Sequence, residues 1–283
     1  MPRLLFVVLV VMAGCVGDPA QIDPRPPTGM ALRALEDPAF SWRALTGDTI
    51  TIYTQPGSYA DQHAAALFER TEQDYDYVLD ALQEAPQVHV RVFYVGSREE
   101  MARLTGQERG VIGIADPASP TVALVVNAER PEPVDRHELV HAITVHHWGQ
   151  IGSPTSVEAW RQETWLREGL ATAIGNTCQG ASVRATAAAM VAAGEGLALD
   201  TLVHDFYSHD DLDTYLLSGS AVAYLIDAYG LDRLRALWTG GSAMFEAVYG
   251  RPIAEVNPDW RAWLAATPVS ARPDLALIRE EGC

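Results

Sequence analysis

The sequence contains no lysine, and all 20 of its basic residues are arginines. Schiff-base catalysis and the phosphate-binding P-loop both use a lysine side chain, so its absence excludes these two chemistries. Acidic residues outnumber these arginines, and 37 of them against 20 arginines give a formal net charge of −17 at pH 7. Such an acidic chain is not expected to bind nucleic acid, or to dock by charge on an anionic membrane.

Long hydrophobic runs are also missing. The apolar run Leu4–Val11 follows Arg3 and is too short for a transmembrane helix, so it predicts an export signal. The segment Met12-Ala13-Gly14-Cys15 then resembles the lipobox of bacterial lipoproteins. This resemblance implies cleavage at Cys15, a lipid anchor on its sulfur, and a place in the bacterial cell envelope. An ordinary secretory signal with an incidental cysteine is the alternative.

Cysteine is rare, with three in the chain. With Cys15 assigned to the anchor, Cys178 and Cys283 remain, and a leftover pair in an exported protein suggests a disulfide. The alternative is two free thiols.

Prolines separate the signal from the folded part. Residues 16–39 include Pro19, Pro24, Pro26 and Pro27, and proline-rich segments are extended, so this stretch predicts a tether. We expect one folded region over residues 40–283, with an α/β part at 40–150 and a mainly helical part at 151–283.

Hydrophobic periodicity predicts the elements within that region. In the first part we expect strands at 48–54 and 87–95, one long helix at 59–82, a short helix capped by Ser97, and a hairpin of 110–114 with 121–127. In the second part we expect helices at 182–193, 214–229, 231–238 and 260–264. The expected fold class is therefore α+β, with a small mixed sheet.

One short stretch carries the chemistry, His137-Glu138-Leu139-Val140-His141. In a helix, His137 and His141 lie one turn apart on the same face, where both imidazoles can bind one zinc ion. Glu138 lies beside them and suits the role of general base toward a water molecule. Alternatively, Asp135 and Glu138 form a capping box at the start of a helix, and the histidines are incidental.

A second motif follows, Trp165-Leu-Arg-Glu168-Gly-Leu-Ala171. Together the two motifs resemble the gluzincin metallopeptidases, most closely the peptidase-MA-like domains related to aminopeptidase N, over about a third of the chain. The resemblance implies a zincin-like fold, in which a small mixed sheet packs on the active-site helix ahead of a helical part. It also implies that Glu168 is the third ligand of one zinc ion, although the gap from His141 to Glu168 is longer than in aminopeptidase N.

A competing third ligand is His147, which stands where the metzincin pattern places its last histidine. That pattern needs glycine at the turn that leaves the helix, and here the position is Thr144. Glu168 is therefore preferred.

The segment 215–230 also resembles the peptidase-MA-like domains. In aminopeptidase N a tyrosine shortly before a glycine stabilises the oxyanion, and Tyr215 is the nearest match, one residue further from Gly219 than in that family. The alternatives are that Tyr215 is a half-buried core aromatic, or that His204 or His209 supplies the donor.

The expected function is that of a zinc metallopeptidase in which Glu138 is the general base for a metal-activated water. The edge strand of the sheet would bind the peptide or protein substrate by β-addition. The free-amine recognition segment of aminopeptidase N, Gly-x-Met-x-Asn, is missing before His137, which favours an endopeptidase. The alternatives are a catalytically silent zinc-binding lipoprotein that serves as a binding module, and a hydrolase of another amide such as one in the cell wall.

Overall fold

The computed structural model describes residues 29–106, 111–133, 135–152, 156–175, 177–178 and 180–281. The predicted signal, the lipid-anchor residue Cys15 and most of the predicted tether lie outside these residues, as does Cys283. Within the described part, no helix is long and apolar enough to cross a membrane.

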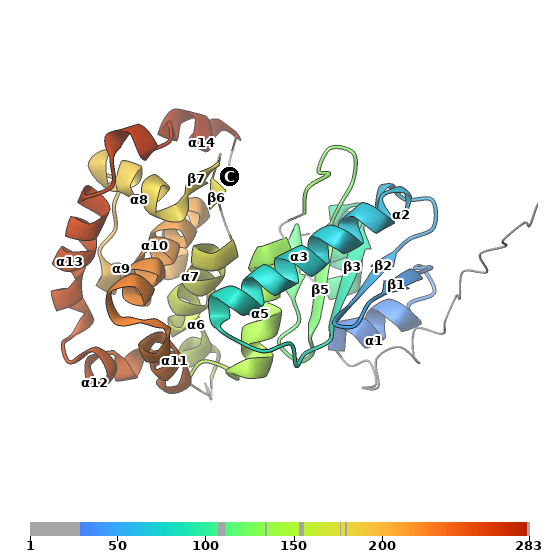
Figure 1. Cartoon of the computed structure of the whole chain (residues 1–283), viewed down its shortest axis with the longest axis horizontal. Helices are drawn as coiled ribbons and strands as arrows, with labels where there is room; N and C mark the ends of the chain where they lie inside the picture. The colour runs from blue at the N-terminus through green and yellow to red at the C-terminus, as the bar shows by residue number, and fades with distance from the viewer. Residues whose placement is uncertain are drawn as a thin grey trace, which may run out of the picture.

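A mixed sheet forms the first part of the fold (Figure 1). Its strands run in the order β1-β2-β3-β5-β4. The three central strands, β2, β3 and β5, are parallel, whereas β1 and β4 pair antiparallel at the two edges. Every residue of the central strands is buried, as expected for parallel strands covered on both faces. The strand bounds are β1 Arg43–Thr46, β2 Ile50–Thr54, β3 Val90–Val95, β4 Gly113–Ala115 and β5 Thr121–Val125.

These strands confirm the two predicted strands and the predicted hairpin, which is β4 with β5. The predicted long helix is instead two helices, α2 Tyr59–Gln62 and α3 Ala64–Leu82. The break lies at His63, whose φ of −114° and ψ of 16° leave the helical region. The capped short helix is α4 Arg98–Thr105, where the Ser97 hydroxyl accepts a hydrogen bond from the Glu100 backbone nitrogen.

Helices cover both faces of the sheet. On one face α3 and α5, Asp135–His147, pack on Ile52, Val92 and Leu124. On the other face α4 and α1, Gly29–Glu36, pack on Phe93 and Val125.

Helix α1 corrects the expectation that residues 16–39 form a tether throughout. Its side chains Met30, Ala31 and Ala34 are buried. The Met30 backbone nitrogen donates a 2.7 Å hydrogen bond to Asp116 Oδ2, at the turn between β4 and β5. Because this contact joins segments far apart in the sequence, local proline content gave no sign of it.

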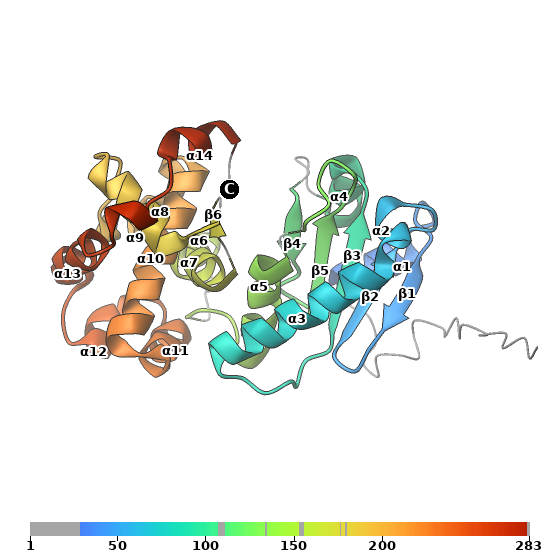
Figure 2. The same ribbon diagram turned by 45° about the horizontal axis from the view of Figure 1, so that its top comes forward.

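The second part of the described chain is helical apart from a short hairpin. Figure 2 shows it beside the sheet, with α5 and α7 where the two parts meet. Its helices include all four that periodicity predicted, α8, α10, α11 and α13. The helices are α6 Val157–Gln162, α7 Thr164–Gly175, α8 Val183–Ala192, α9 Leu199–His204, α10 Asp211–Tyr229, α11 Leu231–Gly240, α12 Phe245–Tyr249, α13 Ile253–Ala265 and α14 Leu275–Glu281. The hairpin pairs β6 Thr177–Cys178 with β7 Ala181–Ser182.

Cys178 is fully buried and disulfide-bonded. This finding removes the alternative of a free thiol at that position. The predicted partner, Cys283, lies outside the described residues, so the pairing stays a prediction.

The fold as a whole is mixed α+β, as expected.

The element that positions the site is α7, which packs between α5 and α10. Glycine makes both contacts close. A methyl group on Gly169 would lie 2.9 Å from the Ser218 carbonyl oxygen of α10, and one on Gly175 would lie 2.6 Å from the His137 backbone nitrogen of α5. Backbone atoms cannot move aside as side chains do, so these glycines set the spacing of three helices.

Candidate metal centre

Helix α5 presents two different faces. Leu139, Val140, Ala142 and Ile143 are fully buried and join the apolar core. The opposite face carries His137 and His141 toward α7. The prediction that the two histidines share one helical face is confirmed, and their ring centroids lie 4.8 Å apart.

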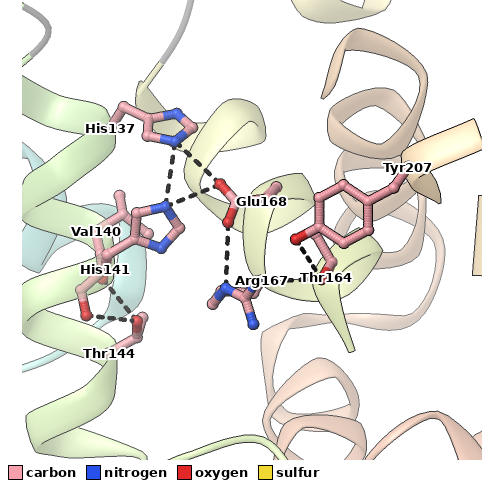
Figure 3. Close-up of polar contacts among 8 residues, drawn as sticks. All are labelled: His137, Val140, His141, Thr144, Thr164, Arg167, Glu168 and Tyr207. Atoms are coloured by element: carbon pink, nitrogen blue, oxygen red, sulfur yellow. Dashed lines mark hydrogen bonds and ion pairs between the residues drawn. The ribbon is translucent and has the colours of Figure 1, made fainter. Parts of the chain in front are cut away.

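Three side chains meet between α5 and α7 (Figure 3). The Nε2 atoms of His137 and His141 are 3.2 Å apart. Glu168 Oε2 lies 3.3 Å from the first and 3.1 Å from the second. These three groups could hold a metal ion, and they are the three ligands that the sequence predicted.

The distances between these atoms suit a small cation. A zinc ion with nitrogen and oxygen ligands at about 2.0–2.1 Å in tetrahedral geometry separates any two of them by about 3.3–3.4 Å. The observed separations of 3.1–3.3 Å are close to that value. Two imidazoles and one carboxylate are also a donor set that zinc accepts, with one position left open. The residues present therefore fit a zinc ion.

The electrostatics of Glu168 favour its ionised form. Burial raises its pKa, but the nearby His141 and the hydrogen bonds from both imidazoles outweigh burial and hold the pKa well below its usual range. The carboxylate is thus charged at neutral pH, as a metal ligand must be.

Glu138 lies beside these three residues and is not a member of the group that could hold a metal. Its side chain is buried and lines the same cavity. Burial raises the pKa of its carboxyl, an effect that His137 and His141 partly offset. The Ala115 backbone of β4 hydrogen-bonds to this carboxyl. Glu138 therefore faces the edge strand. The capping-box alternative also depends on the side chain of Asp135, which is outside the side chains that the structure describes.

The site opens into a cavity of about 840 Å³. Residues of the edge strand β4 line it, as do the apolar side chains of Val145, Ile151 and Trp238. Trp160 and Tyr207, which are 42% and 56% exposed, also line the cavity. This volume lies within the range typical of ligand pockets, about 300–1,000 Å³.

The structure brings Tyr215 to the site. Its ring lies beside that of His137, with centroids 6.0 Å apart, and it lines the cavity. Burial and the nearby Glu168 raise the pKa of its phenol, so the hydroxyl stays protonated and able to donate. His204 and His209, the alternative donors, are exposed and are not among the cavity-lining residues.

His147 does not reach the metal centre. Helix α5 continues through Thr144, whose hydroxyl donates a 2.7 Å hydrogen bond to the Val140 carbonyl. The helix therefore carries His147 away, and its Nδ1 lies 3.1 Å from Glu84 Oε2. The metzincin alternative is wrong for this chain.

Sequence reasoning missed Arg167 at the site. Its Nε donates a 3.2 Å hydrogen bond to Glu168 Oε1, the oxygen that faces away from the histidines (Figure 3). The available signal was its position next to the ligand in the second motif. Neighbours on a helix usually point in different directions, so adjacency alone did not indicate a contact.

No protein-family model matches this sequence, and no curated protein is significantly similar to it.

Proposed function

We propose that this protein is a zinc metallopeptidase of the gluzincin type, with a zincin-like fold, that cleaves internal bonds of peptides. The observation that carries the proposal is the convergence of His137, His141 and Glu168 within 3.1–3.3 Å of one another, with a buried glutamate beside them. A structural zinc site needs no such glutamate, whereas hydrolysis needs a base.

Zinc suits the site because two histidines and a glutamate with an open fourth position are typical of catalytic zinc. When bound, zinc supplies Lewis acidity, which polarises a substrate carbonyl and makes a water molecule more acidic.

Glu138 is the proposed general base. Its carboxylate takes a proton from the attacking water and passes it to the nitrogen of the leaving amine. Burial raises the pKa of Glu138 in the direction of neutral pH. A pKa shifted in this direction helps a group that must both accept and release a proton. Tyr215 is the proposed donor to the oxyanion, because its protonated phenol lies beside His137 in the cavity.

The edge strand β4 is the proposed platform for substrate. Among the strands that the structure describes it is the last in the sheet order, and it lines the cavity together with Glu138. An extended peptide can add to such an edge by main-chain hydrogen bonds, which places a peptide bond near the base.

The location proposed from the sequence is the bacterial cell envelope, through a lipid on Cys15. The disulfide at Cys178 supports an exported protein, because disulfides persist in oxidising compartments.

Two measurements test the function. Metal analysis should find one zinc per chain in the wild type and none in Glu168→Ala. Purified wild type should then cleave a mixed library of peptides, including peptides with blocked amino ends, while Glu138→Gln stays folded, binds zinc and cleaves nothing. If wild type binds zinc but is as inert as Glu138→Gln, the binding-module alternative prevails. If only free amino ends are trimmed, the protein is an aminopeptidase.

A further inference from the structure

The two oxygens of Glu168 have different partners. Oε2 faces the histidines, at 3.3 Å from His137 and 3.1 Å from His141. Oε1 accepts a hydrogen bond from Arg167 Nε at 3.2 Å, as Figure 3 shows. The carboxylate is thereby oriented with a single oxygen toward the metal position.

The arginine is itself held in place. Its Nη2 donates to the Thr164 hydroxyl at 3.1 Å, and its guanidinium carbon lies 3.8 Å from the centroid of the Trp160 ring. Thr164 is fully buried, and the Arg167 side chain is only 15% exposed. A planar guanidinium that is stacked and bonded in two directions loses little further freedom when it holds a carboxylate.

The hydrogen bond matters because a carboxylate can bind a metal through one oxygen or both. Binding through both adds a ligand and fills the position that a catalytic zinc keeps open. It also suits larger cations, which take more oxygen ligands. A cationic donor on Oε1 competes directly with the metal for that oxygen and therefore opposes the two-oxygen arrangement.

We infer that Arg167 is a positioning residue that confines Glu168 to one-oxygen coordination and so keeps the fourth zinc position open. This inference rests on the proposed function, because it assigns Arg167 a role at the same metal centre. Groups that orient a metal ligand typically contribute about 10–100-fold to metal affinity or activity.

The test compares full-length wild type with Arg167→Met, Arg167→Lys and Arg161→Met. Arg161 is an exposed arginine of α6 that is not among the cavity-lining residues, so its replacement makes the same chemical change outside the site. Zinc affinity is measured by competition with a chromophoric chelator, and coordination is followed by the visible absorption of the cobalt(II)-substituted protein. That absorption is intense for four-coordinate cobalt and weaker for five- or six-coordinate cobalt.

We expect Arg167→Met to bind zinc about 10–100-fold more weakly and to give the weaker cobalt absorption. Arg167→Lys keeps the positive charge but not the planar guanidinium, so its zinc affinity and cobalt absorption should lie between those of Arg167→Met and wild type. Arg161→Met should have the zinc affinity and cobalt absorption of wild type. If circular dichroism shows that Arg167→Met does not fold, the cobalt spectrum of Arg167→Lys is the deciding measurement. A spectrum of Arg167→Lys equal to that of wild type then refutes the inference.

Two further results would overturn it. One is an Arg167→Met protein with the affinity and spectrum of wild type. The other is weaker zinc binding with an unchanged cobalt spectrum, because a merely structural role lowers affinity without changing the ligand arrangement. A wild type that binds no zinc would instead refute the proposed function, and the inference with it.

Discussion

Replacing Gly175 by alanine tests whether the contact between two helices sets the geometry of the metal centre. Gly175 is the last residue of α7. A methyl group there would lie 2.6 Å from the His137 nitrogen, 2.8 Å from its Cα and 2.9 Å from the Arg136 carbonyl carbon. All three are backbone atoms of α5, so the helices themselves must separate.

The expected size of the effect follows from those distances. Ordinary contacts begin at 3.4 Å, so α5 and α7 must move apart by roughly half an ångström or more. Overpacking of this kind costs about 1–3 kcal/mol, and the gain of about 0.5–1 kcal/mol from replacing a helical glycine offsets only part of it. A functional site tolerates displacements of only about 0.5 Å, so zinc affinity should fall on the order of tenfold.

The assays are thermal unfolding of the metal-free protein and zinc competition. A net loss of about 1–2 kcal/mol in a chain of this size lowers Tm by roughly 2–8 °C. Gly96→Ala is the control, because its new methyl group would meet only Glu100 Oε2, at 3.4 Å. A Gly175→Ala protein as stable as wild type, with undiminished zinc affinity, would show that this contact does not position His137.

Three further predictions concern stability. Gly169→Ala places a methyl group 2.9 Å from the Ser218 carbonyl oxygen, so it should lower the free energy of unfolding in urea by about 1–3 kcal/mol. An unchanged free energy of unfolding would show that α10 can shift away from α7 without destabilising the fold. Zinc at a hundred times its dissociation constant should raise the free energy of unfolding by about 2.7 kcal/mol in wild type and leave Glu168→Ala unchanged, and an equal rise in both would place the metal elsewhere. Burial raises the pKa of Glu84, but Trp148, Arg235 and His147 together lower it below 4.5, so its ionised form stabilises the fold above that pH. Glu84→Gln should therefore be less stable than wild type at pH 7, and the difference in stability should shrink as pH falls through the lowered pKa. A difference in stability that does not depend on pH would contradict this prediction.

Much of the fold could be predicted because its signals are local. The buried strands alternate β-branched residues, and the predicted helices 182–193, 214–229 and 231–238 carry helical periodicity or high alanine content, so these were predicted within a few residues. Helix α13 was predicted only over 260–264, whereas it begins at Ile253. Two of the elements that were not predicted depend on distant partners. Strand β1, Arg43–Thr46, has a weak pattern of exposed and half-buried residues, and it forms by pairing with β2. Helix α1 forms where its buried face meets α4 and the sheet.

The candidate site likewise contains residues with a local sequence signal and residues without one. His137, Glu138 and His141 could be predicted because one helical turn relates them, whatever the rest of the chain does. Glu168 came from resemblance, since nothing in local spacing connects it to α5. Arg167 could not be predicted, because its role depends on a long side chain that contacts Thr164 in its own helix and Trp160 in α6. Nothing in the sequence pattern fixes that rotamer.

The longer gap between His141 and Glu168, compared with aminopeptidase N, need not disturb the metal centre. Ligand geometry here depends on where α7 lies, and α7 is held at its end by the contact of Gly175 with His137 and along its length by the contact of Gly169 with Ser218. Both contacts lie outside the segment that joins α5 to α7. Adding residues to a connection costs only about 0.6 kcal/mol for each doubling of its length, whereas moving a packed helix by half an ångström costs more. Helix packing therefore sets the position of Glu168, the proposed third ligand, and the number of residues between His141 and Glu168 can vary without moving it.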